Sequence, residues 1–178
     1  MKQSDAKKLA EECGFTNCGI FDVKEMKFMT EVRDMCRANL CGLYGKCWTC
    51  PPAIDELEEI AAKAREYKWG ILLQTTAYME DEFDGETMME AQNAQKERFV
   101  RYYKQLRENQ IEHLAMSSGG CNKCKKCTYP DAPCRYPEFA VPSMEAYGLL
   151  VTDVCNSANI PYYYGKNTIT FSSCVLFK

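Results

Sequence analysis

Four cysteines in the segment 121–134 have a spacing that is typical of a metal centre. Three follow C-x2-C-x2-C spacing and the fourth comes six residues after the third: Cys121, Cys124, Cys127 and Cys134. Thiols separated by two residues pair poorly as disulfides, because the bridge requires a defined dihedral angle and Cα separation. C-x2-C-x2-C is the run that ligates a [4Fe–4S] cluster in bacterial ferredoxins, although there the fourth cysteine follows after three residues. The spacing favours an iron–sulfur cluster, with zinc as the alternative metal.

A second group of cysteines lies in the segment 36–52: Cys36, Cys41, Cys47 and Cys50. This segment contains two glycines and ends in Pro51-Pro52, a composition that suits a loop wrapped around a ligand. We expect at least three of its four thiols to bind metal. The remaining cysteines fall in predicted helices and strands, where a free thiol packs as a small apolar residue: Cys13, Cys18, Cys155 and Cys174.

Composition restricts the classes of protein that fit. The chain has 178 residues and is 46% hydrophobic, which suits one domain with a core of its own. A net charge of −3 provides no basic footprint for nucleic acid. We find no apolar signal segment and no run long enough to span a membrane. The expected location is therefore the cytoplasm, where thiols stay reduced and clustered cysteines indicate metal or redox chemistry.

Few other residues suggest chemistry. The single histidine, His113, excludes a multi-histidine metal site and is expected to be structural. Lys123, Lys125 and Lys126 are expected to offset the charge of a thiolate-ligated cluster, or to dock an acidic redox partner. Glu145 lies one residue into a predicted helix, where a carboxylate stabilises the helix end; a catalytic acid beside the metal is the alternative. No phosphate-binding loop or radical-SAM spacing is present, so no catalytic residue is assigned.

The hydrophobic pattern predicts the elements that position these loops. Helices are expected at 4–13, 24–37, 55–67, 84–108 and 144–157, with caps at Ser4 and at Asp55 with Glu58. Strands are expected at 16–23, 69–77 and 111–116, and a closing hairpin at 162–177. The alternation predicts one α/β (α+β) domain over 1–178, a sandwich with a mixed four- or five-stranded sheet flanked by helices. The cysteine-rich loops, 36–52 and 117–137, are expected to meet at the ends of these elements.

Three blocks of sequence resemble a prokaryotic family known as domain of unknown function 2284 and predicted to bind metal. The resemblance rests on the cysteine segment ending in Trp48-Thr49-Cys50-Pro51-Pro52, on Gly119-Gly120-Cys121 through Glu138, and on Pro142 through Gly148. By this resemblance, Cys36, Cys41 and Cys50 form one ligand set, and the four cysteines of 121–134 form another. Cys47 is extra to the family pattern. The resemblance implies metal binding but no reaction.

Three functions remain open from the sequence. The first is an iron–sulfur protein with one or two [4Fe–4S] clusters that supplies electrons to a redox partner protein. The second is an iron–sulfur enzyme, in which Cys36, Cys41 and Cys50 hold a cluster with one iron open to substrate. The third is a zinc-stapled interaction module built on the 121–134 segment. In each case the aromatic side chains beside the cysteines are expected to shield the metal from water: Tyr44, Trp48 and Tyr129.

Overall fold

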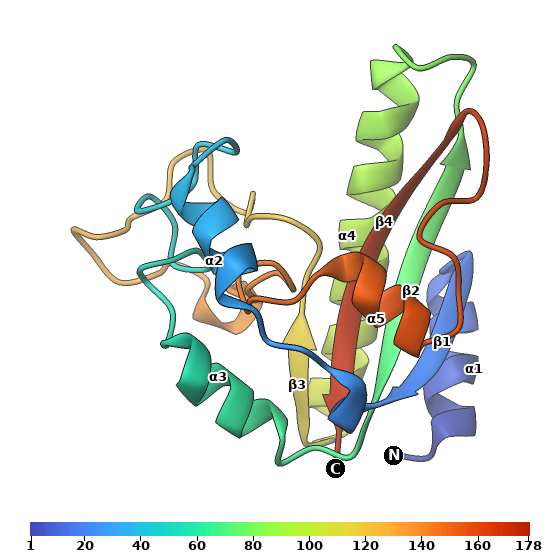
Figure 1. Ribbon diagram of the computed structural model, residues 1–178, viewed down its shortest axis with the longest axis horizontal. Helices are drawn as coiled ribbons and strands as arrows, with labels where there is room; N and C mark the ends of the chain where they lie inside the picture. The colour runs from blue at the N-terminus through green and yellow to red at the C-terminus, as the bar shows by residue number, and fades with distance from the viewer.

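The computed structural model describes all residues, 1–178, and contains five α-helices, four strands and two short 3-10 helices (Figure 1). The helices are α1 (Gln3–Cys13), α2 (Thr30–Arg37), α3 (Leu57–Ala64), α4 (Gly85–Glu108) and α5 (Val151–Ser157). The strands are β1 (Asn17–Asp22), β2 (Trp69–Tyr78), β3 (His113–Met116) and β4 (Thr168–Phe177). The 3-10 helices are η1 (Val23–Glu25) and η2 (Pro137–Phe139).

The four strands form one sheet in the order β1-β2-β4-β3. The predicted α+β domain with a four-stranded sheet is confirmed, but every neighbouring pair is antiparallel, whereas a mixed sheet was expected. Helix α4 does cross over between β2 and β3, which makes these two strands parallel to each other. However, β4 lies between them and runs antiparallel to both, so no parallel pair is hydrogen-bonded.

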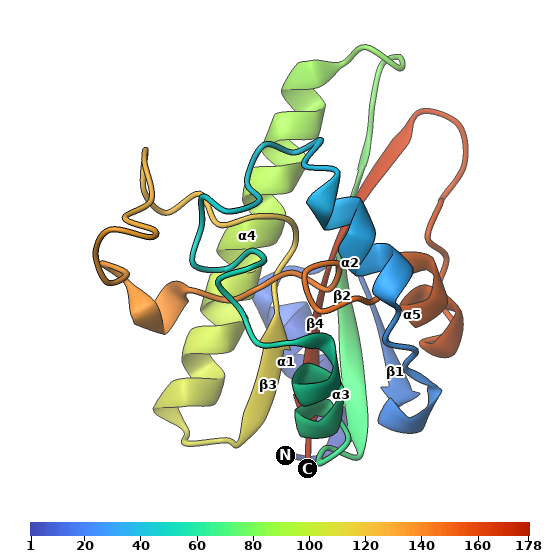
Figure 2. The same cartoon turned by 60° about the vertical axis from the view of Figure 1, so that its left-hand side comes forward.

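Helices cover both faces of the sheet (Figures 1 and 2). On one face, α1 and α4 pack through Ala10, Phe99 and Tyr102 onto alternate strand residues such as Ile71. On the other face, α5 and the end of α3 pack against Leu72 and its neighbours. One face of α4 is buried in this core. The core role expected for Cys13, Cys155 and Cys174 is confirmed, while Cys18 is only partly buried, against the cluster formed by α1 and α4.

The last two predicted elements of the chain differ from expectation. The helix expected at 144–157 begins only at Val151, because Gly148 has a positive φ of 76° and its carbonyl oxygen accepts a hydrogen bond from the Met29 amide. The prediction of a closing hairpin at 162–177 is also wrong. Only Thr168–Phe177 is a strand, and it pairs with β2 rather than with residues 162–164.

The predicted caps and helix starts differ as well. Ser4 lies inside α1, and the capping box of Asp55 with Glu58 is not formed, since α3 begins after Glu56 without a side-chain cap. The expected helix at 24–37 is divided into η1 and α2, which begins at Thr30. His113 is structural: its Nδ1 lies 2.6 Å from the Ile111 carbonyl oxygen, and its ring packs edge-on against Tyr103.

The cysteine-rich segments lie outside this sandwich. Together with α2, α3 and η2 they form a lobe beside the edge strand β3 (Figures 1 and 2). None of the helices is both long and apolar enough to cross a membrane. Both core clusters lie outside the cysteine-rich segments, so the sandwich has a core of its own. The lobe contains the residues from which chemistry was expected.

Candidate metal centre

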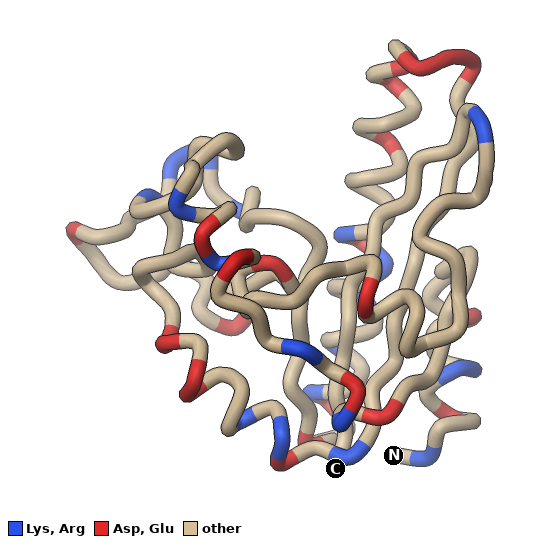
Figure 3. The backbone as a smooth tube through the Cα atoms, viewed as in Figure 1, with Lys and Arg blue, Asp and Glu red and all other residues tan.

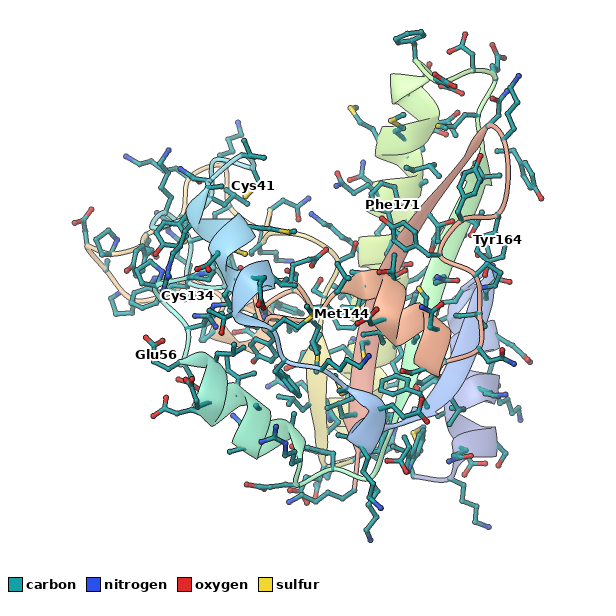
Figure 4. All side chains as sticks on the ribbon, in the orientation of Figure 1. Cys41, Glu56, Cys134, Met144, Tyr164 and Phe171 are labelled. Atoms are coloured by element: carbon teal, nitrogen blue, oxygen red, sulfur yellow. The ribbon has the colours of Figure 1, made fainter.

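The two cysteine-rich loops contact each other directly, as expected from the sequence. The indole Nε1 of Trp48 donates a hydrogen bond of 3.1 Å to the carbonyl oxygen of Ala132. The Trp48 ring also packs edge-on against Tyr129, with ring centroids 4.9 Å apart and an interplanar angle of 88°. In Figure 4, Cys41 and Cys134 lie in the same lobe, one from each loop, on the opposite side of the molecule from Tyr164. Loops more than sixty residues apart in sequence thus form one site.

The larger of two adjoining cavities in the lobe has a volume of about 710 Å³ and receives thiols from both loops. Its six cysteines are Cys41, Cys47, Cys121, Cys124, Cys127 and Cys134. Six basic side chains also line it, and no acidic one does: Lys46, Lys96, Lys123, Lys125, Lys126 and Arg135. We call it the cationic cavity. Trp48 and Tyr129 are among its walls, as predicted.

Cys47, which the family pattern does not include, lies between the two predicted ligand sets. Its side chain is buried, with 3% exposed, and its sulfur lies 3.3 Å from the Thr49 hydroxyl. Hydrogen bonding to Cys121, and then to Cys50, holds the pKa of the Cys47 thiol well below its ordinary value. The same contacts raise the pKa of Cys50 and of Cys121. Cys47 therefore belongs with the thiols of the cationic cavity.

The smaller cavity, of about 310 Å³, contains the three thiols that the resemblance grouped together: Cys36, Cys41 and Cys50. Most of its lining residues are hydrophobic, so we call it the apolar cavity. The thiol of Cys36 donates to the backbone carbonyl oxygen of Glu145 at 3.8 Å. Burial raises the pKa of Cys36, and the neighbouring Cys41 and Glu145 raise it further.

The two cavities share a wall of four residues: Cys41, Leu43, Gly119 and Gly120. Leu43 packs so closely on Gly120 that a Cβ atom at position 120 would overlap its side chain. A larger residue than glycine at this point would force the Leu43 side chain to move. Cys41 is the one thiol that both cavities contain.

Three cationic residues of the site were not expected from the sequence. Lys96 extends from the middle of α4, Lys46 comes from the first cysteine loop and Arg135 from the second. A lysine in a long charged helix resembles a solvated residue, so no pattern in the sequence could single out Lys96. Only the packing of α4 against the lobe identifies it.

The expected role of Glu145 in capping a helix is wrong, because α5 begins at Val151 and residue 145 lies in a turn. Its side chain is exposed and lines the apolar cavity. No group of three or more histidine, cysteine, aspartate or glutamate side chains converges closely enough to hold a single metal ion. Cys47 nevertheless brings thiols of the two loops into contact, because it hydrogen-bonds to Cys121 and to Cys50.

Comparison with known proteins gives one finding. The model of the family described as predicted metal-binding protein (DUF2284) matches residues 19–177, which include both cysteine loops. No curated protein and no solved structure matches the chain significantly. The family match supports metal binding by the lobe, and it leaves the metal and the reaction to be inferred from the site.

Proposed function

The chain belongs to the DUF2284 family of predicted metal-binding proteins, and we propose that its metal is iron in a [4Fe–4S] cluster bound in the cationic cavity. The proposed ligands are the four cysteines of the second loop: Cys121, Cys124, Cys127 and Cys134. The observation that supports this most is the composition of the cavity wall, with six thiols, six basic side chains and no acidic side chain.

The donor set fits a cluster better than a single zinc ion. Zinc fingers usually space their four ligands as two separated pairs, whereas Cys121, Cys124 and Cys127 follow two consecutive two-residue gaps. A cubane cluster binds each thiolate at a different iron, so its ligands lie around a cavity. Cys121, Cys124, Cys127 and Cys134 all line the cationic cavity, and their spacing resembles that of a cluster-binding run, which supports iron–sulfur over zinc.

The charge of the two cysteine loops also supports an anionic occupant. The two cysteine loops contain six basic side chains and one acidic side chain, although the whole chain has a net charge of −3. Figure 3 shows basic positions around these loops, whereas an acidic run follows the end of β2. A cluster with four thiolate ligands is an anion, so these cations lower its free energy in the cavity.

We propose electron transfer as the function. When bound, the cluster would accept and donate single electrons at a potential set by its surroundings. The second-loop cysteines are only half-buried, so an electron can reach a redox partner protein through a thin layer of side chains. Trp48 and Tyr129 shield the same cavity from water, which favours a stable cluster.

A second candidate function is an iron–sulfur enzyme, and the apolar cavity favours it. Cys36, Cys41 and Cys50 share this separate cavity, while Cys47 faces the cationic cavity. Three thiols can hold a cluster in which one iron lacks a protein ligand. A cavity beside such a site could admit a substrate.

Metal and sulfide analysis of anaerobically purified protein tests these proposals. Visible absorption with about four irons and four sulfides per chain is expected for one cluster, and about eight of each for two. Electron paramagnetic resonance of the reduced protein would distinguish one centre from two. A colourless protein with stoichiometric zinc and no sulfide would overturn the iron–sulfur proposal, provided that the preparation excluded air throughout.

A further inference from the structure

The apolar cavity has the size and walls of a small-molecule site. Its volume of about 310 Å³ lies at the lower end of the range for ligand pockets, about 300–1,000 Å³. Its apolar walls come from three parts of the chain that are distant in sequence. Val32 and Met35 belong to α2, Leu43 and Pro51 to the first cysteine loop, and Leu150 to the turn before α5.

The rim of this cavity exposes apolar side chains to solvent. Met35 is 65% exposed, Leu40 is 95% exposed and Leu150 is 36% exposed, and all three line the same cavity. Isolated apolar residues on a surface need no explanation, but three around one hollow indicate a surface that a ligand covers. An occupant with a hydrocarbon body would remove this area from water.

The charge of the cavity restricts the occupant further. Glu145 is the only charged side chain among the lining residues, and its carboxylate has no hydrogen bond or ion pair in the structure. The adjoining cationic cavity is the reverse, with basic residues and no carboxylate. The apolar cavity therefore favours a cation and repels an anion.

We propose that the apolar cavity binds a small hydrocarbon amine, with its ammonium group at Glu145 and its apolar body against Met35 and Leu40. The inference deepens the second candidate function, because it names the substrate class of that site. Binding itself uses only side chains of this chain and does not depend on which metal the cysteines hold. The cavity volume of about 310 Å³ suits a small molecule of this kind.

Three probes of one shape and different charge test the proposal on the anaerobically purified holoprotein: benzylamine, benzyl alcohol and benzoate. Calorimetric titration gives the affinities. Isotope-labelled methionine methyl groups give the location, because Met35 lines the cavity and Met89, on α4, is equally exposed but does not. Benzylamine is expected to bind most tightly and benzoate most weakly, and the Met35 signal alone is expected to shift.

Two variants identify the contacts. Glu145→Gln is expected to lower the affinity for benzylamine about fivefold, the loss for one partly exposed ion pair, and to leave the affinity for benzyl alcohol unchanged. Glu31→Gln is the matched control, since Glu31 is an exposed carboxylate on α2 outside both cavities. Leu40→Ser is expected to weaken benzylamine and benzyl alcohol alike, and its near-complete exposure leaves folding intact.

The proposal is overturned if no probe binds, if benzoate binds as tightly as benzylamine, or if Glu145→Gln has no more effect than Glu31→Gln. Iron and sulfide are measured on the same samples. Amine binding by a protein that contains only zinc would overturn the iron–sulfur proposal and support the amine site. A full iron and sulfide content without amine binding would support the iron–sulfur proposal and overturn the amine site.

Discussion

The ammonium group of Lys96 donates a hydrogen bond of 3.2 Å to the carbonyl oxygen of Gly120, the residue before Cys121. This bond connects the longest helix of the sandwich to the second cysteine loop. It also places a positive charge, half-buried, beside the proposed cluster. Burial lowers the pKa of Lys96, and the nearby Cys121 opposes this shift.

The first prediction concerns that charge. A cation near a cluster stabilises its reduced, more negative state, so Lys96→Met is expected to lower the midpoint potential by tens of millivolts. Lys96→Arg keeps the positive charge, so its midpoint potential is expected to stay close to that of the wild type. Lys104→Met removes an exposed lysine of the same helix, outside the cationic cavity, and is the control. Redox titration at fixed iron content measures the three values, and equal potentials in the wild type and Lys96→Met would contradict the role.

The second prediction distinguishes a ligand from a core thiol. Cys124→Ser is expected to lose most of the iron of the cationic cavity while the sandwich stays folded, because both core clusters lie outside the cysteine loops. Cys155→Ser is expected to keep all iron and to cost about 1–3 kcal/mol of stability. The cost falls toward the lower value because Gln74 Nε2, 3.5 Å from the Cys155 sulfur, can donate to the new hydroxyl.

Iron analysis and urea unfolding measure these two effects separately. The assignment would be wrong if Cys124→Ser kept its full iron, or if Cys155→Ser lost it. Circular dichroism of Cys124→Ser is the check that the helices and the sheet persist.

The sequence predicted the sandwich well where a single pattern was strong. The apolar run at 69–77 became β2, and the stripe at 84–108 became α4, because long segments with one clear period leave few alternatives. The turns before α5 were mistaken for helix, because a tertiary contact to Met29 and a bridge between Phe28 and Leu149 determine their conformation. Periodicity contains no information about such distant contacts.

The site shows the same limit. The cysteine spacing identified the two loops and predicted their contact, because thiol ligands are recognisable from residue type alone. The spacing could not show that the site has two cavities of different charge. The boundary between them depends on the packing of the Leu43 side chain on Gly120, and on which cavity the Cys47 side chain faces. Lys96 was missed for the same reason.

The third prediction concerns pH. Burial raises the pKa of the Cys155 thiol from 9.0 to about 11. At pH values between these two pKa values the unfolded chain loses the thiol proton and the folded chain keeps it. The unfolded state therefore binds fewer protons than the folded state, so the stability falls as the pH rises. Cys155→Ala removes this dependence. The stability gap between the wild type and Cys155→Ala is therefore expected to narrow by about 1–2 kcal/mol from about pH 8 to about pH 10.5. Urea unfolding at the two pH values measures the gap, and a constant gap would contradict the prediction.

The last prediction tests the wall between the two cavities. Gly120→Ala adds a Cβ atom where the end of the Leu43 side chain packs, so Leu43 must shift and the packing of the shared wall is disturbed. Overpacking of this kind costs about 1–3 kcal/mol, and we expect lower iron retention on dilution in anaerobic buffer. Leu43→Ala in the same chain frees the space and is expected to restore iron to the level of Leu43→Ala alone. Gly85→Ala, at a position where no atom lies within 4 Å of the added Cβ, is the control. If the double variant retained no more iron than Gly120→Ala, the contact between Leu43 and residue 120 would not be what holds the two loops together.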